Sequence, residues 1–134
     1  MNEFQKLEEM IKVYEKNTET LHRHLIGENW FGDHEQLGDY YEHLLEDVDT
    51  LAELGLACGI EEPTMEESYK YYKELEIKDR VSKESYSILK DMFDDIVAQV
   101  NRIKDVSADV INKLQEMQEY YRVESEFKLY RAIR

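Results

Sequence analysis

The sequence predicts an all-α protein: one domain, residues 1–134, in which four long helices form a bundle. A short extra helix is expected in the long crossover between the second and third helices. Proline occurs once and glycine five times, and all six residues lie between Gly27 and Pro63. Outside that zone, hydrophobic residues recur every three or four positions, as in a helix with one buried face. A chain of 134 residues is long enough for one hydrophobic core.

The first two predicted helices fold back on each other. The first covers roughly residues 2–26 and the second roughly residues 33–58. A turn at residues 27–32 joins them, and Gly59 is the expected C-terminal stop of the second helix. Their predicted inward-facing stripes are Phe4, Leu7, Ile11, Tyr14, Thr18, Leu21 and Leu25 in the first helix, and Leu37, Tyr41, Leu44, Val48, Leu51 and Gly55 in the second.

The remaining helices follow a long connection. Thr64 and Glu67 have the spacing of a capping box, which predicts a short helix through about Leu75. A third long helix is expected after Ser82, and Ser107 is a candidate N-cap for a fourth. Their predicted inward-facing residues are Tyr86, Leu89, Phe93, Ile96, Val100 and Ile103, then Val110, Leu114, Met117 and Tyr121. Of the connections, only residues 59–81 are long enough to cross the bundle from end to end.

Charge narrows the classes of partner. Seventeen Lys and Arg residues against 31 Asp and Glu residues give a net charge of -14, which repels nucleic acid and anionic membranes. DNA binding is therefore not expected. The weak basic cluster of Lys128, Arg131 and Arg134 is explained as well by a favourable interaction with the helix C-terminus.

The cysteine count and the hydropathy point to a cytoplasmic protein. Cys58 is the single cysteine, so an internal disulfide and a cysteine-based metal site are excluded, and a reducing compartment is favoured. No apolar run approaches the ~20 residues of a membrane span, and no signal peptide opens the chain. A membrane partner is not expected.

Four residues form a candidate metal-ligand set: His22, His34, Asp49 and Glu53. Between Arg23 and Lys70 the chain contains no lysine or arginine, and imidazole with carboxylate suits iron or another transition metal. On one helix, His34 and Asp49 would be about 22 Å apart at about 1.5 Å per residue, too far to share a metal. Asp49 and Glu53 share a helix face. The chain therefore carries two half-sites, and a complete site requires a second, antiparallel copy.

The second helix also carries a continuous acidic stripe. At about 100° per residue, its members fall within an arc of roughly 80°: Glu35, Asp39, Glu42, Glu46, Asp49 and Glu53. One interpretation is a solvated face. The other is a surface that collects hard cations, because no interleaved lysine relieves the repulsion between the carboxylates.

Other sites are less well supported. An intrachain di-iron site would require Glu-x-x-His motifs on two facing helices, and the predicted third and fourth helices contain no histidine. His24 and His43 are interpreted as ordinary surface or core residues. The tyrosine-rich patches at residues 69–72 and 120–121 are interpreted as packing or interface residues, with redox relays as the alternative. Nucleophilic catalysis by Cys58 is not supported, because no histidine lies at a suitable spacing in the sequence. Glycine-rich loops that bind phosphate are absent.

The segment His22-Arg-His-Leu-Ile-Gly-Glu-Asn-Trp-Phe-Gly-Asp-His34, followed by Asp49-Thr-Leu-Ala-Glu53, Gly59 and Pro63-Thr64, resembles the Dps family. These are the miniferritins of the ferritin-like superfamily. The resemblance spans nearly the whole chain, since the crossover helix and the last helix, opening at Ser107-Ala108-Asp109, also fit. It implies a ferritin-like bundle, a dodecameric cage, and ferroxidase centres at two-fold interfaces. One subunit would supply His22 and His34, and the other Asp49 and Glu53.

The resemblance also implies a function. Iron(II) would be oxidised, characteristically by hydrogen peroxide, and stored as a ferric mineral, which protects against oxidative stress. The acidic stripe would face the cavity as a mineral-nucleation surface, and Asp105 and Asp109 would lie at iron-entry pores. The chain departs from the family pattern at Arg23, usually tryptophan, at Leu54, usually arginine, and in lacking a basic N-terminal tail. A second class of function stays open: a ferritin-like scaffold or interaction protein with a vestigial site or a structural zinc.

Overall fold

A computed structural model describes residues 1–78 and 84–133 of the chain, and every regular element in these ranges is a helix, as predicted. The elements are α1 (Glu3–Arg23), α2 (Trp30–Ala57), α3 (Met65–Leu75), α4 (Ser85–Asn101), α5 (Ala108–Val123), the π-helix η1 (Glu124–Leu129) and α6 (Tyr130–Ile133). The last three follow one another without a break. Within the described ranges, no helix is both long enough and apolar enough to cross a membrane.

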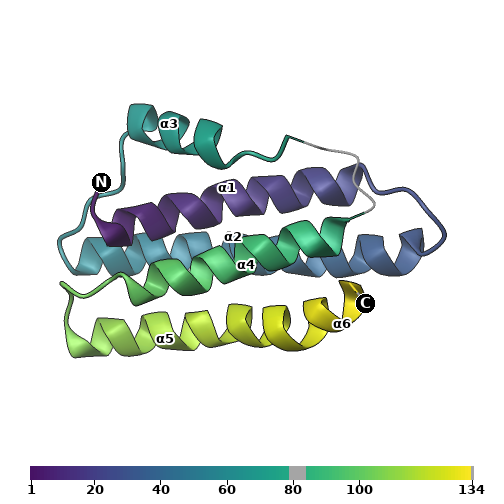
Figure 1. Cartoon of the computed structure of the whole chain (residues 1–134). Helices are drawn as coiled ribbons and strands as arrows, with labels where there is room; N and C mark the ends of the chain where they lie inside the picture. Colours follow the sequence, from purple (N-terminus) through teal and green to yellow (C-terminus); the bar gives the residue numbers. More distant parts are fainter. Residues whose placement is uncertain (79–83, 134) are drawn as a thin grey trace.

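The four long helices α1, α2, α4 and α5 lie side by side, and α3 lies on the outside of α1 (Figure 1). Helix α2 runs antiparallel to α1, α4 runs in the same direction as α2, and α5 returns antiparallel to α4. The chain between α2 and α4 therefore passes along the length of the molecule, and α3 forms part of it. This confirms the predicted short helix in the long connection.

The hydrophobic core lies between the four long helices. The predicted stripe of α1 is buried from Phe4 to Leu21, and Leu25 packs at its edge. Helix α2 contributes buried Leu37, Leu44 and Leu51. From α4 to α5 the buried residues are Leu89, Met92, Phe93, Ile96, Val100, Ile103, Val110, Leu114 and Tyr121. The predicted core is largely confirmed, with Tyr41, Val48, Tyr86 and Met117 only partly buried.

The helix ends lie near their predicted positions, although α1 ends at Arg23, before the predicted 26. Asn2 caps α1 instead of beginning it, because its side chain accepts a hydrogen bond from the Gln5 amide at 2.8 Å. Helix α2 starts at Trp30, earlier than the predicted 33. The capping box of Thr64 and Glu67 is confirmed. Ser107 occupies the N-cap position without a side-chain cap bond to the backbone. Ser82 lies outside the described residues.

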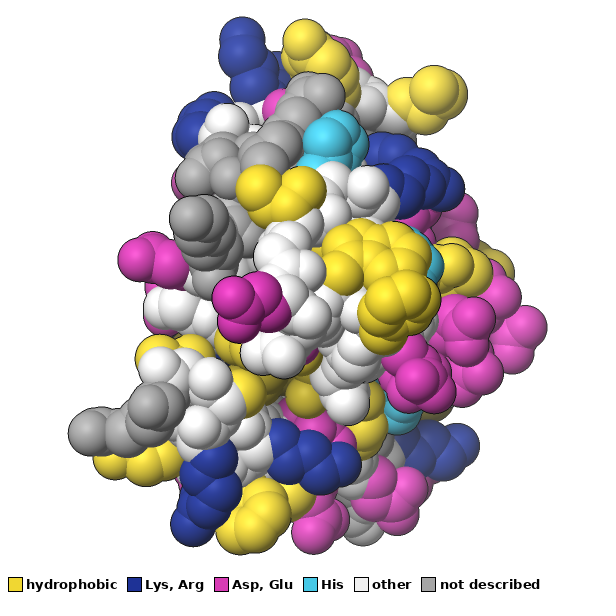
Figure 2. All heavy atoms as spheres, turned by 90° about the vertical axis from the view of Figure 1, so that its right-hand side faces the viewer, with side chains coloured by type: hydrophobic (Ala, Val, Ile, Leu, Met, Phe, Trp, Pro, Cys, Tyr) yellow, Lys and Arg dark blue, Asp and Glu magenta, His cyan; other side chains and the backbone are white. Residues whose placement is uncertain are grey.

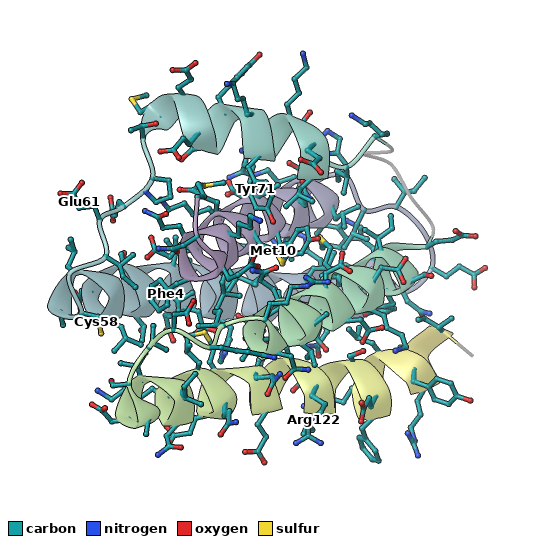
Figure 3. The ribbon with its side chains drawn as sticks, turned by 60° about the vertical axis from the view of Figure 1, so that its left-hand side comes forward. Phe4, Met10, Cys58, Glu61, Tyr71 and Arg122 are labelled. Atoms are coloured by element: carbon teal, nitrogen blue, oxygen red, sulfur yellow. The ribbon has the colours of Figure 1, made fainter. Side chains whose placement is uncertain are left out.

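Helix α3 is attached to α1 by buried polar and aromatic contacts. The Asn17 side-chain amide donates to the Leu75 carbonyl at 3.1 Å and its oxygen accepts from the Ile77 amide at 3.2 Å. Tyr71 projects from α3 towards α1, on the side of Met10 (Figure 3). These bonds give hydrogen-bond partners to backbone groups at the C-terminal end of α3, which have none within the helix. They also hold the connection between α2 and α4 against α1.

Candidate metal centre

The turn between α1 and α2 brings His22 and His34 into direct contact. Their rings stack with centroids 3.7 Å apart and planes inclined by 21°. The Nδ1 atom of His22 lies 2.7 Å from the His34 carbonyl oxygen, and the Nδ1 atom of His34 lies 3.2 Å from the His22 carbonyl oxygen. A carbonyl oxygen can only accept, so each Nδ1 carries a hydrogen, and in the neutral rings the lone pair is on Nε2. Imidazole held by a carbonyl at one nitrogen is oriented for metal binding at the other.

Three neighbouring residues hold this pair in place. The Trp30 ring stacks on His34 with centroids 4.4 Å apart, and Tyr41 contacts the edge of His22 at 5.2 Å. A Cβ atom at Gly38 would lie 3.2 Å from Cε1 of His22, so a side chain there would press on the ring. The spacing of residues in the sequence did not predict these contacts. A glycine in mid-helix, one turn after His34, was the available signal, because it costs about 1 kcal/mol relative to alanine.

Burial tunes His22 towards the neutral form. Removal from water lowers the pKa of His22, and the hydrogen bond to the His34 carbonyl offsets only part of this shift. A neutral imidazole is the form that binds metal ions. The pair is therefore a candidate half-site with two nitrogen donors.

The other two predicted ligands are not near this pair. Asp49 and Glu53 are exposed on the later half of α2. For a helix that rises about 1.5 Å per residue, they lie about 22 Å and about 28 Å beyond His34. Within residues 1–78 and 84–133, no three His, Cys, Asp or Glu side chains of the chain gather to hold a metal ion. The structure brings together His22 and His34 and leaves the carboxylate half-site separate.

The acidic stripe of α2 is exposed along its whole length, as predicted: Glu35, Asp39, Glu42, Glu46, Asp49 and Glu53 all reach solvent. Figure 2 shows the end of the molecule where α1 turns into α2. Acidic side chains gather on this face beside a hydrophobic patch. Exposed apolar residues near this turn include Ile26, Trp30 and Phe31.

The remaining candidates have ordinary surroundings. Asp105 and Asp109 are exposed around the α4–α5 turn, and a hydrogen bond with Ser107 lowers the pKa of Asp109. His24 uses Nδ1 to donate to the Thr20 carbonyl, and Nε2 of His43 lies 3.3 Å from Asp47. Cys58 is exposed at the end of α2 (Figure 3).

The described residues thus form an all-helical fold. Its candidate metal ligands are an imidazole pair at the α1–α2 turn and two carboxylates further along α2. Nitrogen and oxygen donors of this kind bind iron, manganese and zinc. Comparison of the chain with models of protein families, with curated proteins and with solved structures found no match. The function is therefore inferred from these residues and their geometry.

Proposed function

We propose that the protein is an iron-oxidising and iron-storing miniferritin of the Dps type, with a ferroxidase centre shared by two subunits. The observation that carries this proposal is the oriented His22–His34 pair, with Asp49 and Glu53 about 22 Å and about 28 Å from His34 along α2. An antiparallel second copy would place its own carboxylates opposite this pair. Two-fold symmetry would then create two equivalent centres in each dimer.

The connectivity of the helices supports a ferritin-like bundle. Two antiparallel pairs, α1 with α2 and α4 with α5, are joined by one long crossover that carries α3. One long crossover is the connectivity of ferritin-like four-helix bundles. The resemblance of residues 22–64 to the Dps family points to a cytoplasmic cage of twelve subunits.

Exposed apolar side chains of α2 support the two-fold interface. Phe31, Leu45 and Leu56 are 84%, 50% and 59% exposed, and Leu45 and Leu56 share a helix face with Asp49. Apolar groups on an exposed face are stabilised when another surface covers them. A second copy of α2 on this face would bring the two half-sites together.

The donor set suits the oxidation of iron(II), which is the substrate. Neutral imidazole nitrogens and carboxylates bind the ion, and the carboxylates offset the charge that it gains on oxidation. Hydrogen peroxide is the proposed electron acceptor. The exposed stripe of Glu35, Asp39, Glu42 and Glu46 would collect the product as mineral, and Asp105 and Asp109 would attract incoming iron.

Complementation between two inactive variants tests the shared centre. One variant carries His22→Ala and His34→Ala, and the other carries Asp49→Ala and Glu53→Ala. Each alone should oxidise iron(II) slowly. After dissociation and joint reassembly, half of the dimers are mixed and each mixed dimer regains one of its two centres, so about a quarter of the parent activity returns.

An activity that stays at the level of the separate variants would contradict a centre shared between subunits. Metal analysis of the parent protein tests the alternative function, a ferritin-like scaffold with a structural zinc site. One tightly held zinc per half-site pair, together with no iron oxidation, would identify a structural site on a ferritin-like scaffold.

A further inference from the structure

A second cluster, on the side of α2 that faces α4 and α5, has no part in the proposed metal centre. Its aromatic rings form a continuous array. Ring centroids are 5.2 Å apart for Tyr40 and Phe93, 5.0 Å for Phe93 and Tyr121, and 5.2 Å for Tyr121 and Tyr120. His43 stacks on Tyr120 at 3.5 Å. The array therefore leads from half-buried Tyr120 to the fully buried ring of Tyr121 and on to Tyr40.

The buried tyrosines of this array each have a carboxylate partner. The Tyr121 hydroxyl donates to Oδ2 of Asp47 at 2.5 Å, and the Tyr40 hydroxyl donates to Oε2 of Glu124 at 3.0 Å. The Tyr121 side chain is 0% exposed, so its proton cannot pass directly to water. Asp47 is the base within hydrogen-bonding distance.

The π-helix η1 supplies part of this cluster. Glu124 and Ser125 begin η1 and are both buried, at 7% and 0% exposure. Glu124 accepts from Tyr40, while Ser125 donates to Asp94 and accepts from Lys90 at 3.0 Å. A π-helical turn of this kind is rare and occurs frequently at functional sites. Here it directs two consecutive polar side chains inward, and the first of them, Glu124, binds the Tyr40 hydroxyl.

We propose that Tyr121, with Asp47 as its proton acceptor, is a one-electron donor that reduces strong one-electron oxidants such as the hydroxyl radical. The electron leaves the Tyr121 ring for the oxidant, and the hydroxyl proton moves along the existing hydrogen bond to Asp47. Tyr121–OH, Asp47–COO⁻ and HO• become Tyr121–O•, Asp47–COOH and HO⁻. Tyr120 connects the buried ring to the surface.

Electrostatics requires that the proton and the electron leave together. Burial, and then the negative charge of Asp47, raise the pKa of Tyr121 well above its usual value. The phenolate is therefore not available as a donor, and a cationic radical in a buried site would be strongly disfavoured. Transfer of the proton to Asp47 leaves both groups neutral.

The test uses the metal-free protein and photogenerated tris(bipyridine)ruthenium(III) as the oxidant. Electron paramagnetic resonance of samples frozen after illumination detects phenoxyl radicals. The parent protein should give a long-lived, hydrogen-bonded phenoxyl signal. Tyr121→Phe keeps the ring and should reduce that signal several-fold. The matched control, Tyr69→Phe, removes a hydroxyl from an exposed ring and should leave the signal unchanged.

Asp47→Asn separates a redox role from packing. Asparagine still accepts a hydrogen bond but is not a base, so the radical yield should fall several-fold although the fold is retained. Tyr14 and Tyr86 also donate to carboxylates, Asp95 and Asp33, and Tyr14→Phe should keep the parent signal. A parent-like radical signal in Asp47→Asn would overturn the proposal. This outcome can be measured even if Tyr121→Phe does not fold. No iron is present, so this result is independent of the proposed ferroxidase function.

Discussion

Glu8 is a carboxyl group buried without a partner. It lies on α1 against Gly55 of α2, is 1% exposed, and neither carboxylate oxygen has a hydrogen bond within the described residues. Burial raises its pKa to about 7; Lys12 acts against this shift, whereas Glu62 and Glu9 add to it. In the folded protein Glu8 is therefore protonated in mildly acidic solution and becomes charged above neutral pH.

The raised pKa predicts that stability is lost as pH rises. The folded pKa is about 7 against 4.5 for the free side chain, so the folded state binds the proton more tightly. The contribution of this proton to the free energy of unfolding is complete below about pH 4.5 and is lost between about pH 4.5 and 7. The change is at most roughly 3 kcal/mol. Glu8→Gln imitates the protonated group and should be more stable than the parent at pH 8.

Urea unfolding at pH 5 and pH 8 measures this difference. Glu15 titrates in the same window, because burial and then a hydrogen bond with Glu19 raise its pKa to about 7. Glu8→Gln should therefore reduce the pH dependence without abolishing it. Glu66→Gln, at an exposed position, serves as the control. A parent-like pH dependence in Glu8→Gln would show that Glu8 is not protonated in the folded state.

Single ligand substitutions should separate activity from folding. His22→Ala and Asp49→Ala are each expected to slow peroxide-driven iron(II) oxidation at least about tenfold, because even residues that only orient metal ligands have effects of this size. Neither side chain belongs to the core, so thermal unfolding should change little. His24 is an exposed histidine two positions after His22, and His24→Ala should keep the parent rate of iron oxidation. Parent rates in both ligand variants would place the oxidation centre elsewhere.

At the level of the helices, Gly55 sets how closely α1 approaches α2. A Cβ atom at this position would lie 2.8 Å from both Oε1 of Glu8 and Cε1 of Phe4. Overpacking costs roughly 1–3 kcal/mol, which exceeds the gain of about 1 kcal/mol in helix propensity from glycine to alanine. Gly55→Ala should therefore destabilise the protein.

Gly32→Ala is the matched substitution on the same helix. No atom would lie within 4 Å of a Cβ at position 32, so the propensity gain is not opposed and stability should rise by up to about 1 kcal/mol. Urea unfolding of the two variants should give changes of opposite sign. A stabilised Gly55→Ala would mean that Phe4 and Glu8 can move aside at little cost.

Helix periodicity was sufficient to predict the long helices and most of the core, because each helix has one buried face. It was less successful on α2, which contacts α1, α4 and α5. Tyr40 is buried beside Phe93, although the predicted stripe contained Tyr41. The π-helix η1 was not predicted, since a widened turn leaves no periodic pattern in six residues.

The candidate metal centre, like the fold, was predicted only in part from the sequence. The predicted turn between the first two helices is present, and it brings His22 and His34 together. The supporting contacts of Trp30 and Gly38 depend on ring orientation, which residue spacing does not specify. The approach of Asp49 and Glu53 to this pair depends on a second chain, and it stays a prediction.

At the scale of the whole molecule, the separated half-sites predict a hollow oligomer built through two-fold contacts of α1 and α2. Light scattering should detect a particle of twelve 16.1 kDa chains. Replacing both Leu45 and Leu56 with glutamate should yield smaller species, because like charges would then face each other across the two-fold axis. A parent protein that is monomeric at micromolar concentration would contradict both the cage and the shared metal centre.

The charge of the whole molecule predicts no appreciable binding to duplex DNA at physiological salt. Each chain carries -14, and the proposed assembly would multiply that charge. Non-specific affinity for DNA depends on cations that release counterions from phosphate. Two of the C-terminal cations, Lys128 and Arg131, already have partners within the chain. Lys128 lies 2.9 Å from Glu124, and Arg131 lies over the Phe127 ring and donates to its carbonyl; Arg134 lies outside the described residues.

A mobility-shift assay at about 150 mM salt, with metal removed by a chelator to exclude bridging ions, measures this binding. The duplex should migrate as free DNA at every protein concentration. At low salt the screening length grows and repulsion extends further, so lowering the salt should not produce a complex either. A retarded band that disappears only at high salt would show that local cations outweigh the net charge. Lys128→Glu with Arg131→Glu would then have to abolish that band if the C-terminal cluster were responsible.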